Sequence, residues 1–338
     1  MSLVPENIIN LSKELNLALY NGGDKNLEMV KSLVENGAIV NHVNNRDDYY
    51  PTALHSALKG DNPLCVAYLL SKGADPNKGN YLGDTPVTFA LILKSRRTEC
   101  LEILLMDERT DVNLKVGEGN LVDEDEDLKY RAPLHEAIFI CRGSTGSIKL
   151  LLNRGAYAGT TDYMGYTPLH AAVSFGYNEV IKLLLSPEFM ASPENPNGVF
   201  IDAMSYEGFT PLMIACINHK ESTMKLLVAA GAKIDIVNLL ANKKAIDYAK
   251  IGFPDDNNIQ NFLKINRALQ EKMPFAKVIS SIKDVENATT KEQIAKLRVF
   301  QNKDLDRLIG SFLGGRRKKR KTKKKRVSSQ SSYKKRSR

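Results

Sequence analysis

The chain has 338 residues, 43% of them hydrophobic, which is enough to bury a sizeable core in one to three domains. No run of about 18 apolar residues occurs, and the N-terminus lacks the basic-then-apolar order of a secretory signal, so we expect an intracellular protein without a membrane anchor. Residues 314–338 hold 14 of the 48 Lys and Arg and no Asp or Glu, which leaves 34 basic against 39 acidic residues and a net charge of −5 before them.

One short pattern recurs along the chain. It reads TALHSA at 52, DTPVTFA at 84, APLHEA at 132, TPLHAA at 167 and TPLMIA at 210. Two degenerate copies, KELNLA and KAIDYA, extend it in both directions, and the aligned starts are 13, 52, 85, 132, 167, 210 and 244. A basic period of 33 to 35 residues therefore carries three insertions. Self-similarity at such a period predicts a repeat architecture.

Each unit predicts two helices. The Thr caps the first helix, and Pro takes its first position, where no amide donor is needed. In the copy at 167, Leu169, Ala172 and Val173 share one helical face, and Gly176 ends the helix in a left-handed conformation. A second apolar helix and a Gly-containing turn lead to the next Thr-Pro. One such pair cannot bury its own apolar face, so we expect the units to stack.

The pattern resembles that of the ankyrin repeat family, T-P-L-H-x-A, whose unit is a β-turn followed by two antiparallel helices. The resemblance covers about residues 8–262 and implies a mainly α ankyrin-repeat solenoid with β-turn or hairpin connections. We predict this repeat domain of about seven units at 1–262, a short helical extension at 263–313 and a disordered basic tail at 314–338. The insertions VGEGNLVDEDEDLKY before Arg131 and PEFMASPENPNGVF after Ser186 are expected to bulge from its surface.

Three histidines recur three residues after the Thr position, at His55, His135 and His170. Recurrence at one phase favours a structural role, in which a ring nitrogen bonds to the adjacent turn, over a ligand or catalytic role. The acidic run Asp123 to Asp127 is interpreted as a solvated loop, and RGSTGS at 142–147 lacks the Lys-Ser/Thr of a phosphate-binding loop. The four cysteines are too far apart for a zinc or redox motif. We expect no enzyme activity, no metal, no cofactor and no small-molecule substrate.

The concave face is the candidate binding surface. In the ankyrin family, this face is lined by the turn tips and the ends of the first helices, and it usually binds other proteins. Seven of the 13 tyrosines lie in the predicted turn segments, and tyrosine offers rigid contact area to a partner. The alternative is that each ring packs on the next turn. The predicted protein-binding residues are Tyr49, Tyr81, Leu82, Lys129, Arg131, Tyr163, Met164, Tyr166, Ser174, Phe175, Tyr206, Glu207 and Phe209, with Ile92 and Asn218 at further helix ends.

The tail begins with Gly-Gly, after which ten of the eleven residues from 316 to 326 are basic. Such density cannot fold alone, and it is typical of nuclear import signals and of non-specific phosphate contacts to nucleic acid; a solubilising arm is a third alternative. Lysine-rich C-terminal tails on ankyrin proteins are similar to those of large DNA viruses. The predicted contacts to an import receptor or to nucleic acid are Arg316, Arg317, Lys318, Lys319, Arg320, Lys321, Lys323, Lys324, Lys325 and Arg326.

The sequence thus predicts a monomeric, non-enzymatic interaction module of the nucleus or cytoplasm, those of a host cell if the source is viral. Its concave face is predicted to bind a protein partner, and its tail to act in nuclear import or nucleic-acid binding. Two alternatives remain open. One is a ubiquitin-ligase substrate adaptor acting through residues 263–313, and the other is a nucleic-acid-associated protein in which the tail is the main functional element.

Overall fold

The first helix of most units begins directly after a threonine that caps its N-terminus. In the computed structural model, the side chains of four threonines each accept a hydrogen bond from the amide three residues further on. This bond satisfies one of the amides that a helix start leaves without a partner. Proline takes the first helical position after all of them except the first. The capping residues are Thr52, Thr85, Thr167 and Thr210.

The structure describes residues 5–20, 26–42, 52–80, 83–93, 98–115, 131–192, 195–254 and 256–272. All of them belong to the first of the two units into which the chain divides, Met1–Lys272. The predicted basic tail, and the predicted extension beyond Lys272, lie outside the described residues.

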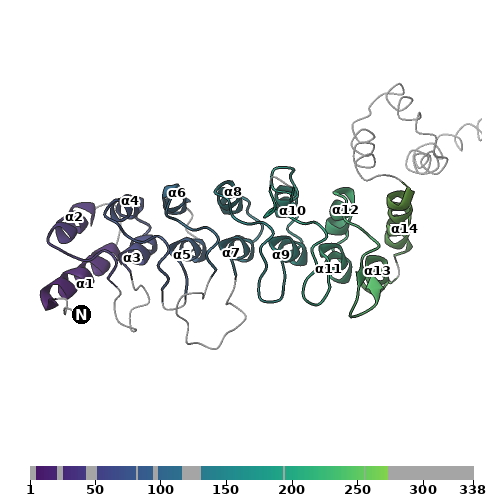
Figure 1. Ribbon diagram of the computed structural model, residues 1–338, viewed down its shortest axis with the longest axis horizontal. Helices are drawn as coiled ribbons and strands as arrows, with labels where there is room; N and C mark the ends of the chain where they lie inside the picture. Colours follow the sequence, from purple (N-terminus) through teal and green to yellow (C-terminus); the bar gives the residue numbers. More distant parts are fainter. Residues whose placement is uncertain are drawn as a thin grey trace, which may run out of the picture. The chain divides into compact units, whose positions relative to one another are not determined.

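Fourteen helices in the described ranges form seven pairs. They are α1 Glu6–Tyr20 and α2 Leu27–Glu35, α3 Ala53–Lys59 and α4 Pro63–Ser71, α5 Pro86–Ile92 and α6 Glu99–Met106, α7 Pro133–Ile140 and α8 Gly146–Asn153, α9 Pro168–Phe175 and α10 Asn178–Leu184, α11 Pro211–Ile217 and α12 Glu221–Ala229, and α13 Ala245–Gly252 and α14 Asn257–Lys272. The first helices contact one another in one row, from α1 to α13, and the second helices form the row beside it (Figure 1). The prediction of a mainly α stack of helix pairs is confirmed.

Six of the seven first helices begin one residue after the predicted unit starts, whereas α1 begins at Glu6, seven residues before its predicted start. The fully buried residues of α1 begin at Ser12, whereas Ile8 and Ile9 in its first turns are only half-buried. A short antiparallel hairpin, β1 Val237–Asn238 and β2 Lys243–Lys244, precedes α13. In its register, Val237 pairs with Lys244 and Asn238 with Lys243.

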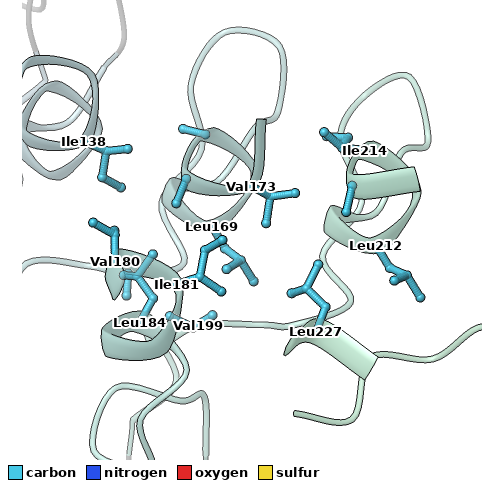
Figure 2. Packing of buried hydrophobic residues seen from close by; sticks show 14 of the residues in the cluster. Ile138, Leu169, Val173, Val180, Ile181, Leu184, Val199, Leu212, Ile214 and Leu227 are labelled. Carbon is cyan, nitrogen blue, oxygen red and sulfur yellow. The ribbon is translucent and has the colours of Figure 1, made fainter. Parts of the chain in front are cut away.

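The apolar core runs along the stack between the two rows. Leu169 of α9, Ile181 of α10 and Leu212 of α11 are fully buried, and Figure 2 shows such side chains pointing into the space between the helices. Interior helices are covered on two sides. On α5, Phe89 packs in the cluster of the pairs before it, whereas Val87 and Leu91 pack in the cluster of the pairs after it. Each pair therefore completes the core of both of its neighbours.

Histidine side chains link first helices to the turn that precedes the next one. Nε2 of His55, His135 and His170 lies 3.1, 3.0 and 3.0 Å from the carbonyl oxygens of three residues one unit further on. All three side chains are fully buried. The prediction that these histidines serve structure by bonding to the adjacent turn is confirmed. The accepting carbonyls belong to Asp84, Tyr166 and Phe209.

The capping threonine also serves the second ring nitrogen. Thr52 Oγ1 lies 2.7 Å from His55 Nδ1, and Thr167 Oγ1 lies 2.8 Å from His170 Nδ1. Since Nε2 donates to a carbonyl, Nδ1 accepts and the hydroxyl donates. The unit at 132 has an alanine in the capping position, and Nδ1 of His135 is buried without a hydrogen-bond partner. A buried polar atom in this state costs about 1–3 kcal/mol.

Asparagine side chains join the turns that follow the second helices. Asn41 Nδ2 donates to the Gly73 carbonyl at 2.9 Å, and its Oδ1 accepts from the Asp75 amide at 2.8 Å. The same two bonds link Asn77 to Arg109 and Asp111, and Asn113 to Gly155 and Tyr157. The equivalent position in the next unit is Gly159, and the one after it is Asp202, whose carboxylate accepts from the Lys233 amide.

The insertion after Ser186 folds back on the stack, and the expectation that it bulges outward is wrong. Phe189 and Met190 pack against the core, and Val199 is buried and forms a parallel bridge with Met190. The insertion passes so close to Gly159 that a Cβ there would lie 2.7 Å from the Gly198 carbonyl oxygen. An asparagine is therefore excluded from position 159. The other insertion, at 116–130, lies outside the described residues.

Helix α14 covers the C-terminal edge of the described stack. Gln270 Nε2 donates to the Ala232 carbonyl, and its Oε1 accepts from the Ile234 amide. Ile259 and Leu263 of this helix are buried in the core. The predicted boundary between residues 262 and 263 falls within α14, and the division of the chain beyond this helix stays a prediction.

Replacing Ala132 by threonine should stabilise the fold. The hydroxyl would cap α7 and donate to Nδ1 of His135, as in the units at 52 and 167, and we expect the free energy of unfolding to rise by about 1–2 kcal/mol. Urea titration measures the change. Ala132→Val is the matched control, because it has nearly the shape of threonine without its oxygen. Equal effects of the two substitutions would contradict the hydrogen-bond explanation.

Acidification should destabilise the fold through the histidine ladder. Burial lowers the pKa of His55, His135 and His170 to about 4, whereas the unfolded chain has histidine pKa values of about 6.5. Between these values the unfolded state binds more protons, so the free energy of unfolding should fall as the pH drops from 6.5 toward 4.

The variant His170→Gln tests this origin, since its side chain does not titrate. It should remove up to about 1.4 kcal/mol per pH unit from the slope. The two proteins are compared by urea titration at pH 7.5, 6 and 5. An unchanged slope in the variant would assign the acid sensitivity to other groups. The buried carboxyls of Asp84 and Glu136 would not be those groups, because their raised pKa values make the free energy of unfolding rise as the pH drops.

Candidate protein-binding surface

Turns with the same hydrogen bonds and the same glycine position precede α5, α9 and α11. In each, the first residue accepts a side-chain hydrogen bond from a backbone amide within the turn. The fourth residue is a glycine with φ between 76° and 79°, a left-handed conformation that glycine adopts without strain. The tips before α9 and α11 are Asp162 to Tyr166 and Ser205 to Phe209, and before α5 the described residues of this turn are Asn80, Gly83 and Asp84.

The tips also brace one another. The Tyr206 amide donates to the Met164 carbonyl at 3.0 Å, and Asn238 Nδ2 donates to the Glu207 carbonyl at 2.9 Å. Three successive tips, including the β1–β2 hairpin, are therefore joined into a row of fixed geometry, below α9, α11 and α13 in Figure 1. We call these residues, 162–166, 205–209 and 237–244, the tip row.

The predicted binding residues of the tip row differ in how far they face solvent. Tyr206 has 74% of its surface exposed, and Glu207 is exposed beside it. Tyr163 and Met164 are half-buried. Two others, Tyr166 and Phe209, pack against the core, and their carbonyls are the ones that accept histidine bonds. The ring of Tyr166 also lies 5.4 Å from the ring of His170.

At the ends of the first helices, the structure brings two predicted residues together through a third that the sequence did not single out. The Arg131 guanidinium lies 4.2 Å from the centre of the Phe139 ring. The Phe139 and Phe175 rings meet edge to face, with their centres 5.5 Å apart. Phe175 is exposed and stacks on Tyr177 at 5.2 Å, while its predicted neighbour Ser174 is half-buried. A row of aromatic rings thus spans two units at the C-terminal ends of α7 and α9.

The charge of Arg131 is matched within the chain. Its guanidinium pairs with Glu136 at 3.6 Å, and both side chains are largely buried. Burial raises the pKa of the Glu136 carboxyl, although Arg131 acts in the opposite direction. The Arg131 cation is therefore engaged within the chain by both the Glu136 carboxylate and the Phe139 ring.

Two exposed leucines in the last tip were missed from the sequence. Leu239 and Leu240 have 81% and 78% of their surfaces exposed. Leu240 stands four residues before its unit start, the same offset as Tyr163 and Tyr206. The aligned start at 244 already places Leu240 at this offset, so the signal was present in the sequence although the two leucines are not among the predicted residues.

Several predicted residues lie outside the described residues: Tyr49, Tyr81, Leu82, Lys129 and all ten basic positions from 316 to 326. Within the described ranges, no three or more His, Cys, Asp and Glu side chains are grouped so that they would hold a metal ion. In the same part of the chain, no helix combines the length and the apolar character needed to cross a membrane.

A family model for ankyrin repeats, built on three copies, matches residues 15–116, 117–197 and 134–238. The chain belongs to the ankyrin repeat family. Ankyrin repeats mediate protein–protein interactions, and the predicted family and fold are confirmed.

Relatives of known sequence include both cellular and viral ankyrin proteins. The human transient receptor potential cation channel subfamily A member 1 is 26% identical over 64% of this chain and 18% of its own length. A putative ankyrin repeat protein of Acanthamoeba polyphaga mimivirus is 30% identical over 44% of this chain and 20% of its own length. The chain thus spans about a fifth of the length of these relatives. For a putative ankyrin repeat protein of fowlpox virus, the identity is 29% over 40% of this chain and 82% of that protein.

Solved structures share the fold. The ankyrin repeat domain of Bcl-3, a member of the IkappaB protein family, has a TM-score of 0.59 at 23% identity, with 74% of this chain and 97% of that chain covered. The human ASB11 ankyrin repeat domain has a TM-score of 0.51 at 26% identity, with 75% of this chain and 96% of that chain covered.

Replacing Gly165 by alanine should disturb the tip row. Gly165 has a φ of +76°, and a Cβ there would lie 2.8 Å from the Tyr206 amide nitrogen. We expect a loss of about 1–3 kcal/mol in the free energy of unfolding, together with a changed environment of Tyr206 in nuclear magnetic resonance spectra. Gly146→Ala is the control, since its Cβ would meet no atom within 4 Å. Equal stability of the two variants would contradict this assignment.

Proposed function

We propose that this ankyrin repeat chain is a non-enzymatic interaction module that binds a protein partner along its concave face and tip row. The observation that carries the proposal is Tyr206. Its ring is exposed at the end of a tip whose backbone is braced on both sides. A rigid exposed aromatic side chain loses little conformational entropy on binding, which is a property of residues that dominate interfaces.

The aromatic row on the helix ends supports the same surface. Phe175 is exposed although two rings already pack against it. The surrounding groups thus hold its orientation without covering it. Together with Tyr206, whose backbone is braced by the neighbouring tips, it offers a partner aromatic contacts on neighbouring units.

For the basic tail, we propose a role in nuclear import or in binding nucleic acid. Ten basic residues within eleven positions would release counterions from a nucleic acid, so such binding would weaken steeply with salt. An import receptor reads the same residues as a linear motif. The protein-binding surface and the tail are separate in sequence, which makes their contributions separable by experiment.

A double substitution and a truncation test whether the repeat domain binds the partner and the tail acts in nuclear import or nucleic-acid binding. Tyr206→Ala combined with Phe175→Ala should lower recovery of protein partners by affinity capture by at least about tenfold, without changing the cellular distribution of a fluorescent fusion. Truncation after Leu313 should change the distribution, or remove nuclease-sensitive binding of nucleic acid, and leave partner capture intact. Capture that disappears with the tail and after nuclease treatment would contradict the proposal and favour a nucleic-acid-associated protein.

A further inference from the structure

The first helix pair exposes apolar side chains at positions that later pairs bury. Leu17 of α1 has 60% of its surface in solvent, and Met29 of α2 has 57%. Leu17 stands four residues after its unit start, and Met29 stands four residues before a leucine that recurs in the second helices. The residues equivalent to Leu17 include Ser56, Phe89, Ala171, Ile214 and Tyr248, and those equivalent to Met29 include Cys65, Cys100, Val180 and Thr223, all of them at most 7% exposed.

In later units, both positions face the preceding unit. Phe89 packs in the core cluster of the helix pairs before it. Thr223 Oγ1 donates to Asn178 Oδ1 of the preceding unit at 2.7 Å. Leu17 and Met29 therefore point away from the rest of the stack, at the end that α1 and α2 form in Figure 1. We call the side of these two helices that carries Leu17 and Met29 the N-terminal edge.

A backbone bond that a preceding ankyrin unit would make is already made within the first unit. In later units, an asparagine of the preceding unit accepts from the amide two residues after the turn glycine, as Asn41 does from Asp75 at 2.8 Å. The equivalent amide of the first unit belongs to Ile39, and it donates to Ser12 Oγ of α1 at 2.9 Å. An upstream ankyrin unit would thus bring an asparagine oxygen without its amide, which disfavours such a unit as the occupant of the edge.

A second copy of this chain avoids that defect. Its own edge presents the same apolar residues and the same occupied amide, so the contact leaves no asparagine of this kind without a partner. The charges beside the apolar residues are balanced as well. Lys13 and Glu14 place one charge of each sign on the side of α1 that carries Leu17. On α2, Glu28 pairs with Lys31 at 2.7 Å. Two such edges therefore meet without an excess of like charge.

The other end of the described stack is covered by the chain itself. Ile259 and Leu263 of α14 are buried in the core, and Gln270 bonds to the turn that follows α12. A second copy therefore finds no open helix pair at this end on which to stack head to tail. A surface that meets the same surface of another copy forms an isologous contact, and such a contact closes at two subunits.

We propose that two copies of the chain associate through the N-terminal edge, around Leu17 and Met29, into a two-fold dimer. This differs from the monomer expected from the sequence. The contact uses α1 and α2 of both copies, whereas Phe175 and the tip row belong to later units. The dimer therefore presents two copies of the proposed partner-binding surface.

Sedimentation velocity of the nuclease-treated full chain tests the proposal. Between about 1 and 100 μM, the mass should rise from 37.6 kDa toward twice that value and no further. Each copy carries a formal net charge of +9, so added salt should favour the dimer by screening repulsion, whereas association through the tail and nucleic acid would weaken. A monomer at every concentration, growth beyond the dimer, or dissociation by salt would overturn the proposal.

Variants of the chain locate the contact. Leu17→Ser combined with Met29→Ser should weaken self-association by at least about tenfold, because both side chains lose their apolar surface. Met106→Ser is the matched control, since Met106 is 77% exposed on α6, outside the N-terminal edge, and should leave self-association unchanged. Circular dichroism melting checks that both variants fold, and Leu17→Ser alone replaces the double variant if that one does not.

An unchanged dimer dissociation constant in the edge variant would overturn the assignment of the contact. If the unsubstituted chain is monomeric and Leu17 and Met29 instead capture a different protein, the edge belongs to that protein and the dimer proposal falls. Neither result bears on the proposed function, which depends on Tyr206 and Phe175. The edge variant should still capture a protein partner through those two residues.

Discussion

Apolar surface shared between successive helix pairs holds this molecule together. Residues such as Leu169, Ile181 and Leu212 are fully buried only because a neighbouring pair covers them. Each such side chain contributes about 1.5–3 kcal/mol on burial, whereas a hydrogen bond contributes a net of about 1 kcal/mol. The histidine and asparagine bonds between units are therefore a minor part of the attraction. Their larger effect is on how neighbouring units align, because a shift of one unit against the next would leave their buried nitrogen and oxygen atoms without hydrogen-bond partners.

The same constraint places the candidate binding surface. Since the helices use both flanks for packing, the tips and the ends of the first helices are among the parts of each unit left to face solvent. The packed helices hold the backbone of these parts in place, whereas the exposed side chains there take no part in the core. Residues there can change between proteins with little effect on the core, which is why the surface of one ankyrin chain says little about that of another.

Much of the fold could be predicted because its signals are local. A threonine before Pro168 or Pro211 determines a helix start by its own hydrogen bond, and recurrence at one phase identifies His170 as a structural residue. The path of the insertion beside Gly159 could not be predicted, because it depends on contact with a residue about forty positions earlier. The direction in which each tip side chain points could not be predicted either. Tyr206 and Phe209 are three residues apart, yet the hairpin turns one outward and the other toward the core.

Gln270 has a consequence for how such an array changes in length over generations. Its amide occupies the Ala232 carbonyl and the Ile234 amide, in the turn whose counterparts in interior units extend an asparagine to the following unit. A duplicated copy added after α14 would find that docking edge taken. A copy inserted among the interior units would find matching partners on both sides. Gene duplication should therefore lengthen this chain from within, with its closing helix carried along unchanged.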